Sequence, residues 1–177
     1  MPSKVCILGA GDKLDVRDVP PDAKVTRVDI RPLPGIDVVA NLQILPQIDS
    51  YNPHVQWNLP EEAFDIVIAE HIVEHVWDRI AFLVACRRLL APNGTLIVEV
   101  PSWKAQVAHN TLEHKSTWGR AIFDDGYITP MLKLKLRKVE FRVGWEWYVF
   151  GYTRGFWGRM LDRVGLVSAY RFHLRRI

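Results

Sequence analysis

Five short apolar segments, each rich in β-branched residues, recur within the first 100 residues and constrain the fold more than any other feature. Their length and the turn residues between them predict strands at residues 4–8, 25–30, 36–40, 64–69 and 95–100. Apolar strands that alternate with crossovers predict an α/β fold with a mostly parallel central sheet and helices on both faces. Ligands of such sheets bind beyond the carboxyl ends of the strands, so the loops that follow the strands are where a site is expected.

The first crossover and one helix can also be predicted from residue order. Only 16 residues, 9–24, join the first two strands, and they include Pro20 and Pro21, so we expect a shortened crossover. A helix is predicted over residues 77–90, where apolar residues fall at helical spacing and Asp78 lies in the first turn.

The rest of the chain is less regular. Residues 43–63 contain three prolines and are predicted to be irregular. Residues 128–137 contain Thr129-Pro130 near their start, a pair typical of the beginning of a helix. Strands are predicted over residues 138–143 and 168–177, with a short helix at 155–165 between them.

The length of 177 residues fits a single domain, residues 1–177. Cys6 and Cys86 have no CxxC or Cys/His neighbours, so we expect two buried thiols and a reducing compartment. No segment reaches the length of an apolar membrane span, and the first apolar run is too short for a signal peptide. A cytoplasmic protein is therefore expected.

Charge is unevenly distributed along the chain. Residues 1–129 contain 12 Lys/Arg and 17 Asp/Glu, a net charge of −5, whereas residues 130–177 contain 11 Lys/Arg and 3 Asp/Glu, a net charge of +8. The same 48 residues hold 10 of the 19 aromatic residues. This basic, aromatic region (residues 130–177) is compatible with nucleic-acid binding, with peripheral membrane contact, or with a core and substrate pocket whose arginines face water.

We favour the last interpretation. In the final segment, strand alternation places Tyr170, Phe172 and Leu174 on one face and predicts a solvent-facing row of Arg171, His173 and Arg175. Residues 145–158 hold seven aromatic residues, more than a small core needs. This stretch is therefore predicted to form a lid, a homodimer contact or a site for a flat substrate.

Two of the strand-end loops carry chemistry. The first contains Gly9-Ala10-Gly11, where glycines let the backbone approach a ligand. The second begins at Asp29, 18 residues after Gly11, and a carboxylate at the end of a second strand can accept both hydrogen bonds of a ribose diol. A tight turn and a capping aspartate are the alternatives.

Four segments, taken together and in order, are more specific. LGAGD, VDIRPLPGIDVVANLQILP, FDIVIAEHIVEHV and RRLLAPNGTLIVEVPS resemble the core of a class I S-adenosylmethionine-dependent methyltransferase of the type 11-like group, in members with a VDIxPLPGxD second strand. The resemblance covers residues 4–102. It implies a Rossmann-like fold, with a cofactor-binding half at residues 1–102 and a substrate-side half at residues 103–177.

The resemblance also implies a cofactor site for S-adenosylmethionine, with S-adenosylhomocysteine as the product. Gly9, Ala10 and Gly11 would lie against the methionine part, and Asp29 would bind the ribose hydroxyls. The adenine would be contacted by the side chains of Ile30 and Asn41 and by the backbone N–H of Leu42, and the sulfonium end would be bordered by Glu70 and His71. Members often have aspartate at the position of Asn41, and this chain lacks their third glycine.

The sequence HIVEH, residues 71–75, has two further interpretations. It matches the H-x-x-E-H pattern of inverted zinc peptidases, but that pattern requires a helix, whereas here it follows a strand directly. A divalent metal held by His71, Glu74 and His75 is compatible with the residue types, since some ubiquinone-biosynthesis methyltransferases bind metal at a similar position. We favour a structural role, in which Glu74 and His75 cap and orient the helix start.

Residues 103–127 follow the fifth strand, where the family places substrate groups. His114 is our candidate for a base or a substrate-orienting group, because imidazole can accept a proton near neutral pH. With His71 it forms the predicted catalytic set. We therefore expect in-line methyl transfer to oxygen or nitrogen of a small-molecule or saccharide-like acceptor. Nucleic-acid methylation and an inactive methyltransferase-like binding module are the alternatives.

Overall fold

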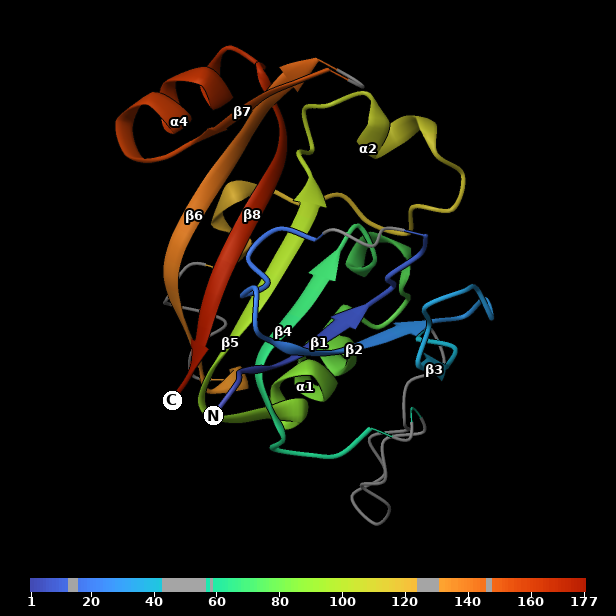
Figure 1. Ribbon diagram of the computed structural model, residues 1–177. Helices are drawn as coiled ribbons and strands as arrows, with labels where there is room; N and C mark the ends of the chain where they lie inside the picture. The colour runs from blue at the N-terminus through green and yellow to red at the C-terminus, as the bar shows by residue number, and fades with distance from the viewer. Residues whose placement is uncertain (13–15, 43–56, 58, 124–130, 146–147) are drawn as a thin grey trace.

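The computed structural model describes residues 1–12, 16–42, 57, 59–123, 131–145 and 148–177. Their strands form one eight-stranded sheet in the order β3-β2-β1-β4-β5-β8-β6-β7 (Figure 1). The predicted α/β fold is confirmed, but the described helices α1 (Arg79–Leu89) and α4 (Gly155–Arg163) pack on one face of the sheet and not on both faces.

The first half of the sheet is parallel, as predicted. It consists of β1 (Lys4–Leu8), β2 (Lys24–Asp29), β3 (Val38–Val39), β4 (Phe64–Glu70) and β5 (Leu90–Pro101). Because β1 lies between β2 and β4, the chain changes direction along the sheet at the carboxyl end of β1. This edge of an α/β sheet is where ligands bind.

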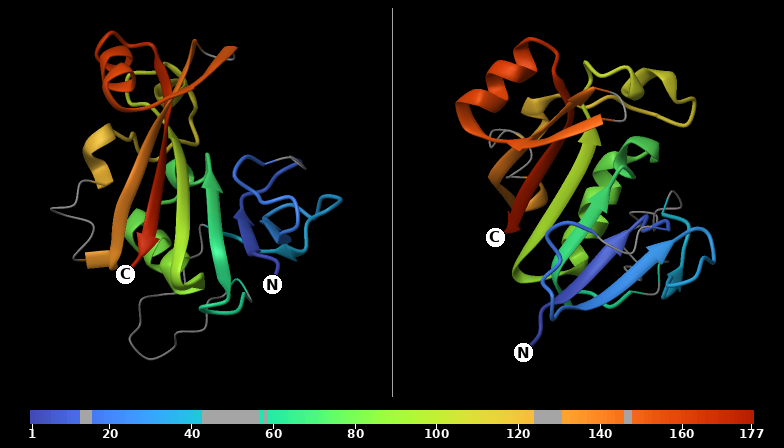
Figure 2. Two further views of the ribbon diagram at one scale, coloured as in Figure 1. Left: turned by 60° about the vertical axis from the view of Figure 1, so that its left-hand side comes forward. Right: turned by 45° about the horizontal axis from the view of Figure 1, so that its top comes forward.

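The second half of the sheet is antiparallel. It consists of β6 (Leu134–Trp145), β7 (Tyr148–Thr153) and β8 (Val167–Arg176). β8 lies between β5 and β6 and joins the two halves, which Figure 2 shows from two further sides.

The helices are α1 (Arg79–Leu89), α2 (Val107–Asn110) and α4 (Gly155–Arg163), with 3₁₀ turns η1 (Val73–His75) and η2 (Arg120–Phe123). The larger core lies between the sheet and α1, which contributes Phe82, Leu83 and Leu89. Leu161 of α4 packs against the same core, and Gly158 lies against the ring of Phe141. Thus α1 and α4 both pack on this first face of the sheet.

The second face has a smaller core around Val5, Ile7, Ile68 and Ile97. Val16 of the first crossover packs in this core, and the described crossover residues 16–23 form turns instead of a helix. The described part of the crossover passes in front of the sheet in Figure 1. The predicted shortening of this crossover therefore leaves a thinner cover on the second face.

Three local predictions are corrected. Of the segment expected to be helical at 128–137, residues 131 and 132 are helical, but residues 134–137 belong to β6. Leu134 and Leu136 alternate with basic residues in the period of a strand, and residues 128–130 lie outside the described part. β5 begins at Leu90, five residues before the predicted start of this strand at residue 95, although Asn93 has a positive φ of 65°.

The third correction concerns the start of α1. Asp78 is the N-cap residue, and its carboxylate accepts a hydrogen bond from the Ala81 N–H at 2.9 Å. Asp78 therefore caps α1, whereas the sequence predicts this role for Glu74 and His75.

The predicted irregular segment 43–63 is described only at residue 57 and from residue 59 onward.

Both cysteines are buried in the larger core, as predicted, and burial raises the pKa of the Cys6 thiol to about 12. Among the described residues, no helix combines the length and the apolar character needed to cross a membrane.

Candidate functional site

The glycine loop and Asp29 meet at the carboxyl ends of β1 and β2. Gly9 and Gly11 have positive φ values of 68° and 58°, a conformation that side chains with a Cβ rarely adopt. The Gly11 N–H donates to Asp29 Oδ2 at 2.8 Å, and the Ala10 N–H donates to the Val28 carbonyl at 3.0 Å. Two motifs that are 18 residues apart in sequence therefore form one cradle.

Asp29 is held as a buried carboxylate with only 5% of its surface exposed. Burial raises its pKa, but hydrogen bonds from the backbone of Arg31 and Gly11 outweigh this effect and lower the pKa below its ordinary value. Oδ1 also accepts from the Arg31 side chain at 3.3 Å, and that side chain is 61% exposed. A ligand hydroxyl can therefore replace the arginine without loss of a buried contact.

The three residues predicted to contact adenine lie next to this cradle along the chain. Ile30 is 56% exposed, Asn41 is half-buried, and the Leu42 side chain is buried in the larger core. The Ala40 N–H donates to the Asp29 carbonyl at 2.9 Å, which fixes the start of the 41–42 segment beside Asp29.

His71 begins the bend that follows β4 and has a positive φ of 53°. Its Nδ1 lies 3.3 Å from Glu74 Oε1, and its Nε2 lies 3.4 Å from Glu99 Oε1. Burial alone would lower the pKa of His71, but the hydrogen bonds to Glu74 and Glu99 prevail and raise it to about 9. The imidazole thus connects the bend after β4 to β5.

Glu70, at the end of β4, forms an ion pair. Its carboxylate pairs with the guanidinium of Arg171, a fully buried side chain of β8 on the second face. Arg171 also donates to Asp18 at 2.9 Å, to Glu99 at 2.8 Å and to the Arg17 carbonyl at 3.1 Å. The prediction that Arg171 faces water is wrong, because the first crossover and two carboxylates cover it.

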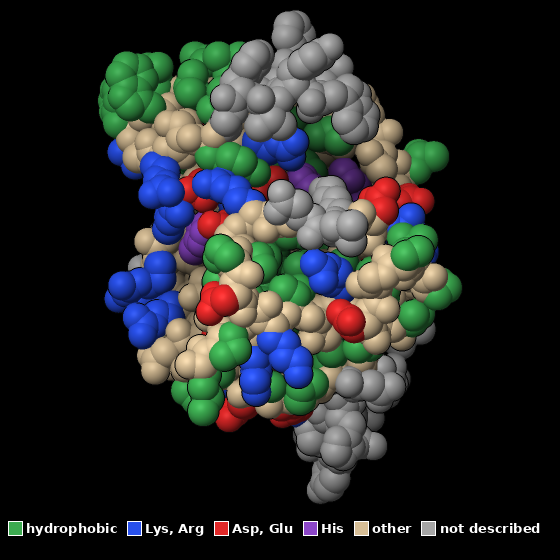
Figure 3. All heavy atoms as spheres, in the orientation of Figure 1, with side chains coloured by type: hydrophobic (Ala, Val, Ile, Leu, Met, Phe, Trp, Pro, Cys, Tyr) green, Lys and Arg blue, Asp and Glu red, His purple; other side chains and the backbone are tan. Residues whose placement is uncertain are grey.

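Part of the uneven charge along the chain is paired within the molecule. Arg142, Arg171 and Arg176 of the basic region pair with Glu99, Glu70 and Glu62 of the acidic first part. Figure 3 shows basic, acidic and histidine side chains interleaved over the side of the molecule that carries β6 and β8. Within the described part of the chain, three of the 11 Lys and Arg residues in 130–177 are therefore matched by carboxylates of residues 1–129.

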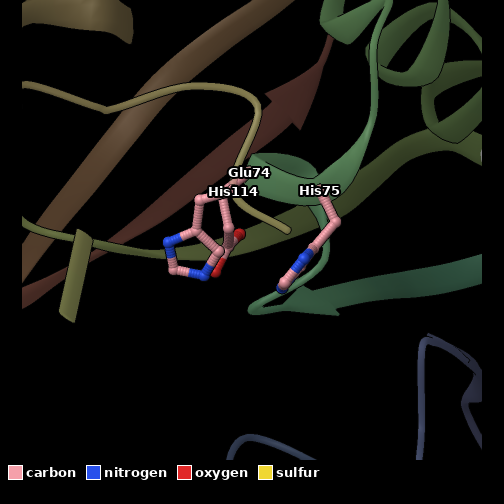
Figure 4. A group of neighbouring side chains, drawn as sticks. All are labelled: Glu74, His75 and His114. Atoms are coloured by element: carbon pink, nitrogen blue, oxygen red, sulfur yellow. The ribbon is translucent and has the colours of Figure 1, made fainter. Parts of the chain in front are cut away.

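A second cluster lies where η1 meets the loop that follows α2, beyond the carboxyl ends of β4 and β5 (Figure 1). Glu74, His75 and His114 each offer a ligand atom, and these atoms lie within 4.8 Å of one another (Figure 4). The rings of His75 and His114 meet edge to face with centroids 4.7 Å apart. The group contains two of the three residues considered for a metal, with His114 in place of His71.

The cluster is held by backbone contacts. The Lys115 N–H donates to the Glu74 carbonyl at 2.7 Å, and the His114 N–H donates to Thr111 at 3.1 Å. His109, in contrast, is exposed, with Nε2 2.6 Å from the Trp103 carbonyl. The Gly9 loop abuts the same bend, since a Cβ at Gly9 would come within 3.2 Å of the Ile72 side chain.

Sequence reasoning missed Glu99, Arg142 and Tyr152 as neighbours of the site. Tyr152 donates to Glu99 at 3.0 Å, and Arg142 lies 3.4 Å from the same carboxylate. The available signal was Glu99 itself, an acid within an otherwise apolar strand, because a buried carboxylate requires partners. Nothing in the sequence indicated which partners these would be.

Comparisons with known proteins identify the family and the fold. The sequence model of a family described as "Methyltransferase domain" matches residues 8–98. A ubiquinone biosynthesis O-methyltransferase of Rhodopseudomonas palustris is 46% identical over 48 residues, which cover 26% of this chain and 19% of that relative. This chain thus spans only about a fifth of that relative's length.

Solved structures share the fold at low sequence identity. A SAM-dependent methyltransferase of Archaeoglobus fulgidus aligns with a TM-score of 0.63 and 16% identity, covering 98% of this chain and 86% of that one. The 1,6-didemethyltoxoflavin-N1-methyltransferase of Burkholderia thailandensis, solved with bound 1,6-didemethyltoxoflavin and S-adenosylhomocysteine, aligns with a TM-score of 0.62 and 14% identity. The alignment covers 99% of this chain and 71% of that one.

Proposed function

The chain belongs to the methyltransferase domain family, and on this premise we propose that it transfers a methyl group from S-adenosylmethionine to a small-molecule or saccharide-like acceptor. When bound, S-adenosylmethionine supplies a methyl group on a positively charged sulfur, so no covalent protein intermediate is needed. The protein must hold the acceptor atom in line with this methyl group and exclude water.

The observation that carries the proposal is the hydrogen bond between the Gly11 N–H and Asp29 Oδ2. It joins an open glycine turn to a buried, ionised carboxylate at the sheet edge where α/β folds bind ligands. Gly9, Ala10 and Gly11 would lie against the methionine part of the cofactor. Asp29 would accept from the ribose hydroxyls after the Arg31 side chain has moved away.

We assign the adenine end to Ile30, Asn41 and Leu42. Exposed Ile30 offers an apolar surface to the ring, and the amide oxygen of Asn41 can accept from the adenine amino group. Leu42 would donate its backbone N–H, since its side chain is buried in the core.

At the sulfonium end we place Glu70 and His71. Glu70 already has a cationic partner in Arg171, so its role there would be to fix the strand end as well as to face the ligand. His71 would position the bend through Glu74 and Glu99. His114, on the loop that follows α2, is the group we propose to contact the acceptor.

The proposed acceptor class rests on the names of similar proteins and on the pairing of the basic residues. One similar protein is named an O-methyltransferase and one structural neighbour an N1-methyltransferase, so oxygen and nitrogen both remain in the proposal. Pairing of Arg142, Arg171 and Arg176 with carboxylates argues against a nucleic-acid acceptor. A steep salt dependence of binding to RNA or DNA would reverse this choice.

The aromatic stretch 145–158 is described only in part. Phe156 and Trp157 of α4 are 66% and 63% exposed, so neither belongs to the core. The side chains of residues 144–151 lie outside the described set. The lid, homodimer and flat-substrate interpretations of this stretch therefore remain predictions, which molar mass from light scattering can begin to separate.

Isothermal titration with S-adenosylhomocysteine tests the proposed function. Binding is expected for a methyltransferase of any acceptor class, whereas absence of binding at millimolar ligand would leave the inactive module as the better description. Asp29→Ala should weaken binding by about 1–3 kcal/mol, or about 5- to 150-fold, through loss of a buried hydrogen-bond partner.

A matched control is Asp65→Ala. Asp65 also accepts from a backbone N–H, that of Lys4 at 2.8 Å, but lies near the amino end of β4, at the opposite edge of the sheet. Its removal should leave ligand affinity unchanged. Equal affinities for wild type and Asp29→Ala would refute the ribose assignment.

A further inference from the structure

Glu74 carries an unsatisfied oxygen at the centre of the cluster with His75 and His114. The side chain is 1% exposed, Oε1 contacts His71, and Oε2 has no hydrogen-bond partner among the described residues. A buried carboxylate oxygen without a partner is costly, and such exceptions often mark a bound ion or water.

The imidazole of His114 has the outer contact that metal-binding histidines usually have, since its Nδ1 lies 3.3 Å from the Ala108 carbonyl. A ring nitrogen that donates to such an oxygen leaves the other nitrogen, Nε2, with its lone pair free. Nδ1 of His75 lies 4.0 Å from the exposed carboxylate of Glu113, which is beyond hydrogen-bond distance. Both rings therefore have a nitrogen available to bind an ion beside the Glu74 carboxylate.

We propose that Glu74, His75 and His114 bind a divalent transition-metal ion of the Zn²⁺ class. Two nitrogens and one carboxylate suit such ions, whereas Mg²⁺ and Ca²⁺ prefer oxygen ligands alone. Tetrahedral coordination needs ligand atoms about 3.4 Å apart, so small side-chain rotations close the present separations of up to 4.8 Å.

The set differs from the one considered from the sequence. His71 is occupied by Glu74 and Glu99 on its two nitrogens, and His114 takes its place from a loop 43 residues later in the chain. Sequence spacing could not reveal this, because the third ligand comes from a different element.

The other group of potential ligands in the described residues makes a useful contrast. Asp18, Glu140 and His173 also lie within 4.8 Å of one another. There, Lys138 and Arg154 already contact Glu140, and Arg171 contacts Asp18. Protein cations fill that group, whereas no Lys or Arg is paired with Glu74 among the described residues.

The role of the ion rests on the proposed function, but its binding does not. Three protein ligands leave a fourth position for water or an acceptor hydroxyl, and a metal lowers the pKa of a hydroxyl bound there. The hydroxyl proton would pass to bulk water, leaving an oxygen able to attack the methyl group. His114 would then act through the metal instead of as the base.

Zn²⁺ titration of chelator-treated protein, in competition with a chromophoric chelator, tests the site. We expect one ion per chain and a tetrahedral absorption spectrum with Co²⁺. Since loss of outer partners of metal ligands costs about 10- to 100-fold in affinity, His114→Gln should weaken Zn²⁺ binding by at least about 100-fold. His109→Gln, an exposed histidine on the same connection, should change nothing.

Glu74→Gln provides a second variant of nearly the same volume, and a folded circular dichroism spectrum shows whether each variant is native. Absence of stoichiometric binding, or equal affinities for wild type and His114→Gln, would overturn the inference. S-adenosylhomocysteine titration of metal-free protein separates the two proposals. Cofactor binding without Zn²⁺ binding refutes only the metal site, and the reverse result refutes only the cofactor site.

Discussion

Replacement of Arg171 by methionine would remove a positive charge from among three carboxylates while keeping much of the side-chain volume. Arg171 donates charged hydrogen bonds to Asp18 and Glu99 at 2.9 and 2.8 Å and pairs with Glu70. In the variant, Asp18 and Glu70, 29% and 17% exposed, can recover some hydration. Glu99, 3% exposed, cannot.

The loss of stability in Arg171→Met depends on which partners the Glu99 carboxylate keeps. Arg142, His71 and Tyr152 still contact its carboxylate at 3.4, 3.4 and 3.0 Å. Removal of one partner from a buried ion pair typically costs about 3–5 kcal/mol. With a urea m-value of about 2 kcal/mol per molar, we expect the unfolding midpoint to fall by about 1.5–2.5 M.

Urea unfolding followed by tryptophan fluorescence and circular dichroism measures this loss. Arg175→Met is the control, since Arg175 lies on the same strand but is exposed, and it should change stability by less than about 0.5 kcal/mol. In the Arg171→Met background, Glu99→Gln should be at least about 1 kcal/mol less harmful than in wild type. Additive effects, or equal stability of the two arginine variants, would refute the buried network.

Two further predictions concern stability. Burial raises the pKa of Glu99, but hydrogen bonds from His71 and Arg171 lower it to about 2, below its ordinary 4.5. Its stabilising contribution is therefore complete above pH 4.5 and declines as pH falls, and we expect wild type to lose about 2 kcal/mol more than Glu99→Gln between pH 6 and pH 3. Parallel acid profiles of the two proteins would contradict this assignment. Gly158→Ala would place a Cβ 2.2 Å from the Phe141 ring, so it should destabilise the protein by about 1–3 kcal/mol in the same urea assay; unchanged stability would mean that α4 moves freely on β6.

The parallel half of the fold could be predicted because its information is local. Each of its strands is a continuous apolar run, and the glycine loop and Asp29 follow directly from strand ends. The antiparallel half depends on contacts between distant residues. The sequence around Leu134 and Leu136 is compatible with a helix or with a strand. These residues form a strand because they pair with β8.

In the candidate site, too, local features could be predicted from the sequence and contacts between distant residues could not. The resemblance predicts Gly11 and Asp29 in one cofactor site, and the two residues are joined by a hydrogen bond, while the cofactor roles themselves stay predictions. Arg171 looked like one of several solvent-facing arginines, because alternation along a strand gives a face but not what covers it. Likewise, His114 lies beside His75 because the Lys115 N–H donates to the Glu74 carbonyl, a contact that no local pattern encodes.

The position of β8 has a consequence for synthesis of the chain. Residues 167–176 leave the ribosome after every other strand of the sheet, yet they supply the partner of both β5 and β6. Until then, the nascent chain exposes one unpaired strand edge on its parallel half and another on the β6–β7 hairpin. Such edges pair readily with other chains. A chain truncated shortly before residue 167 would therefore keep both edges exposed, and we expect it to aggregate.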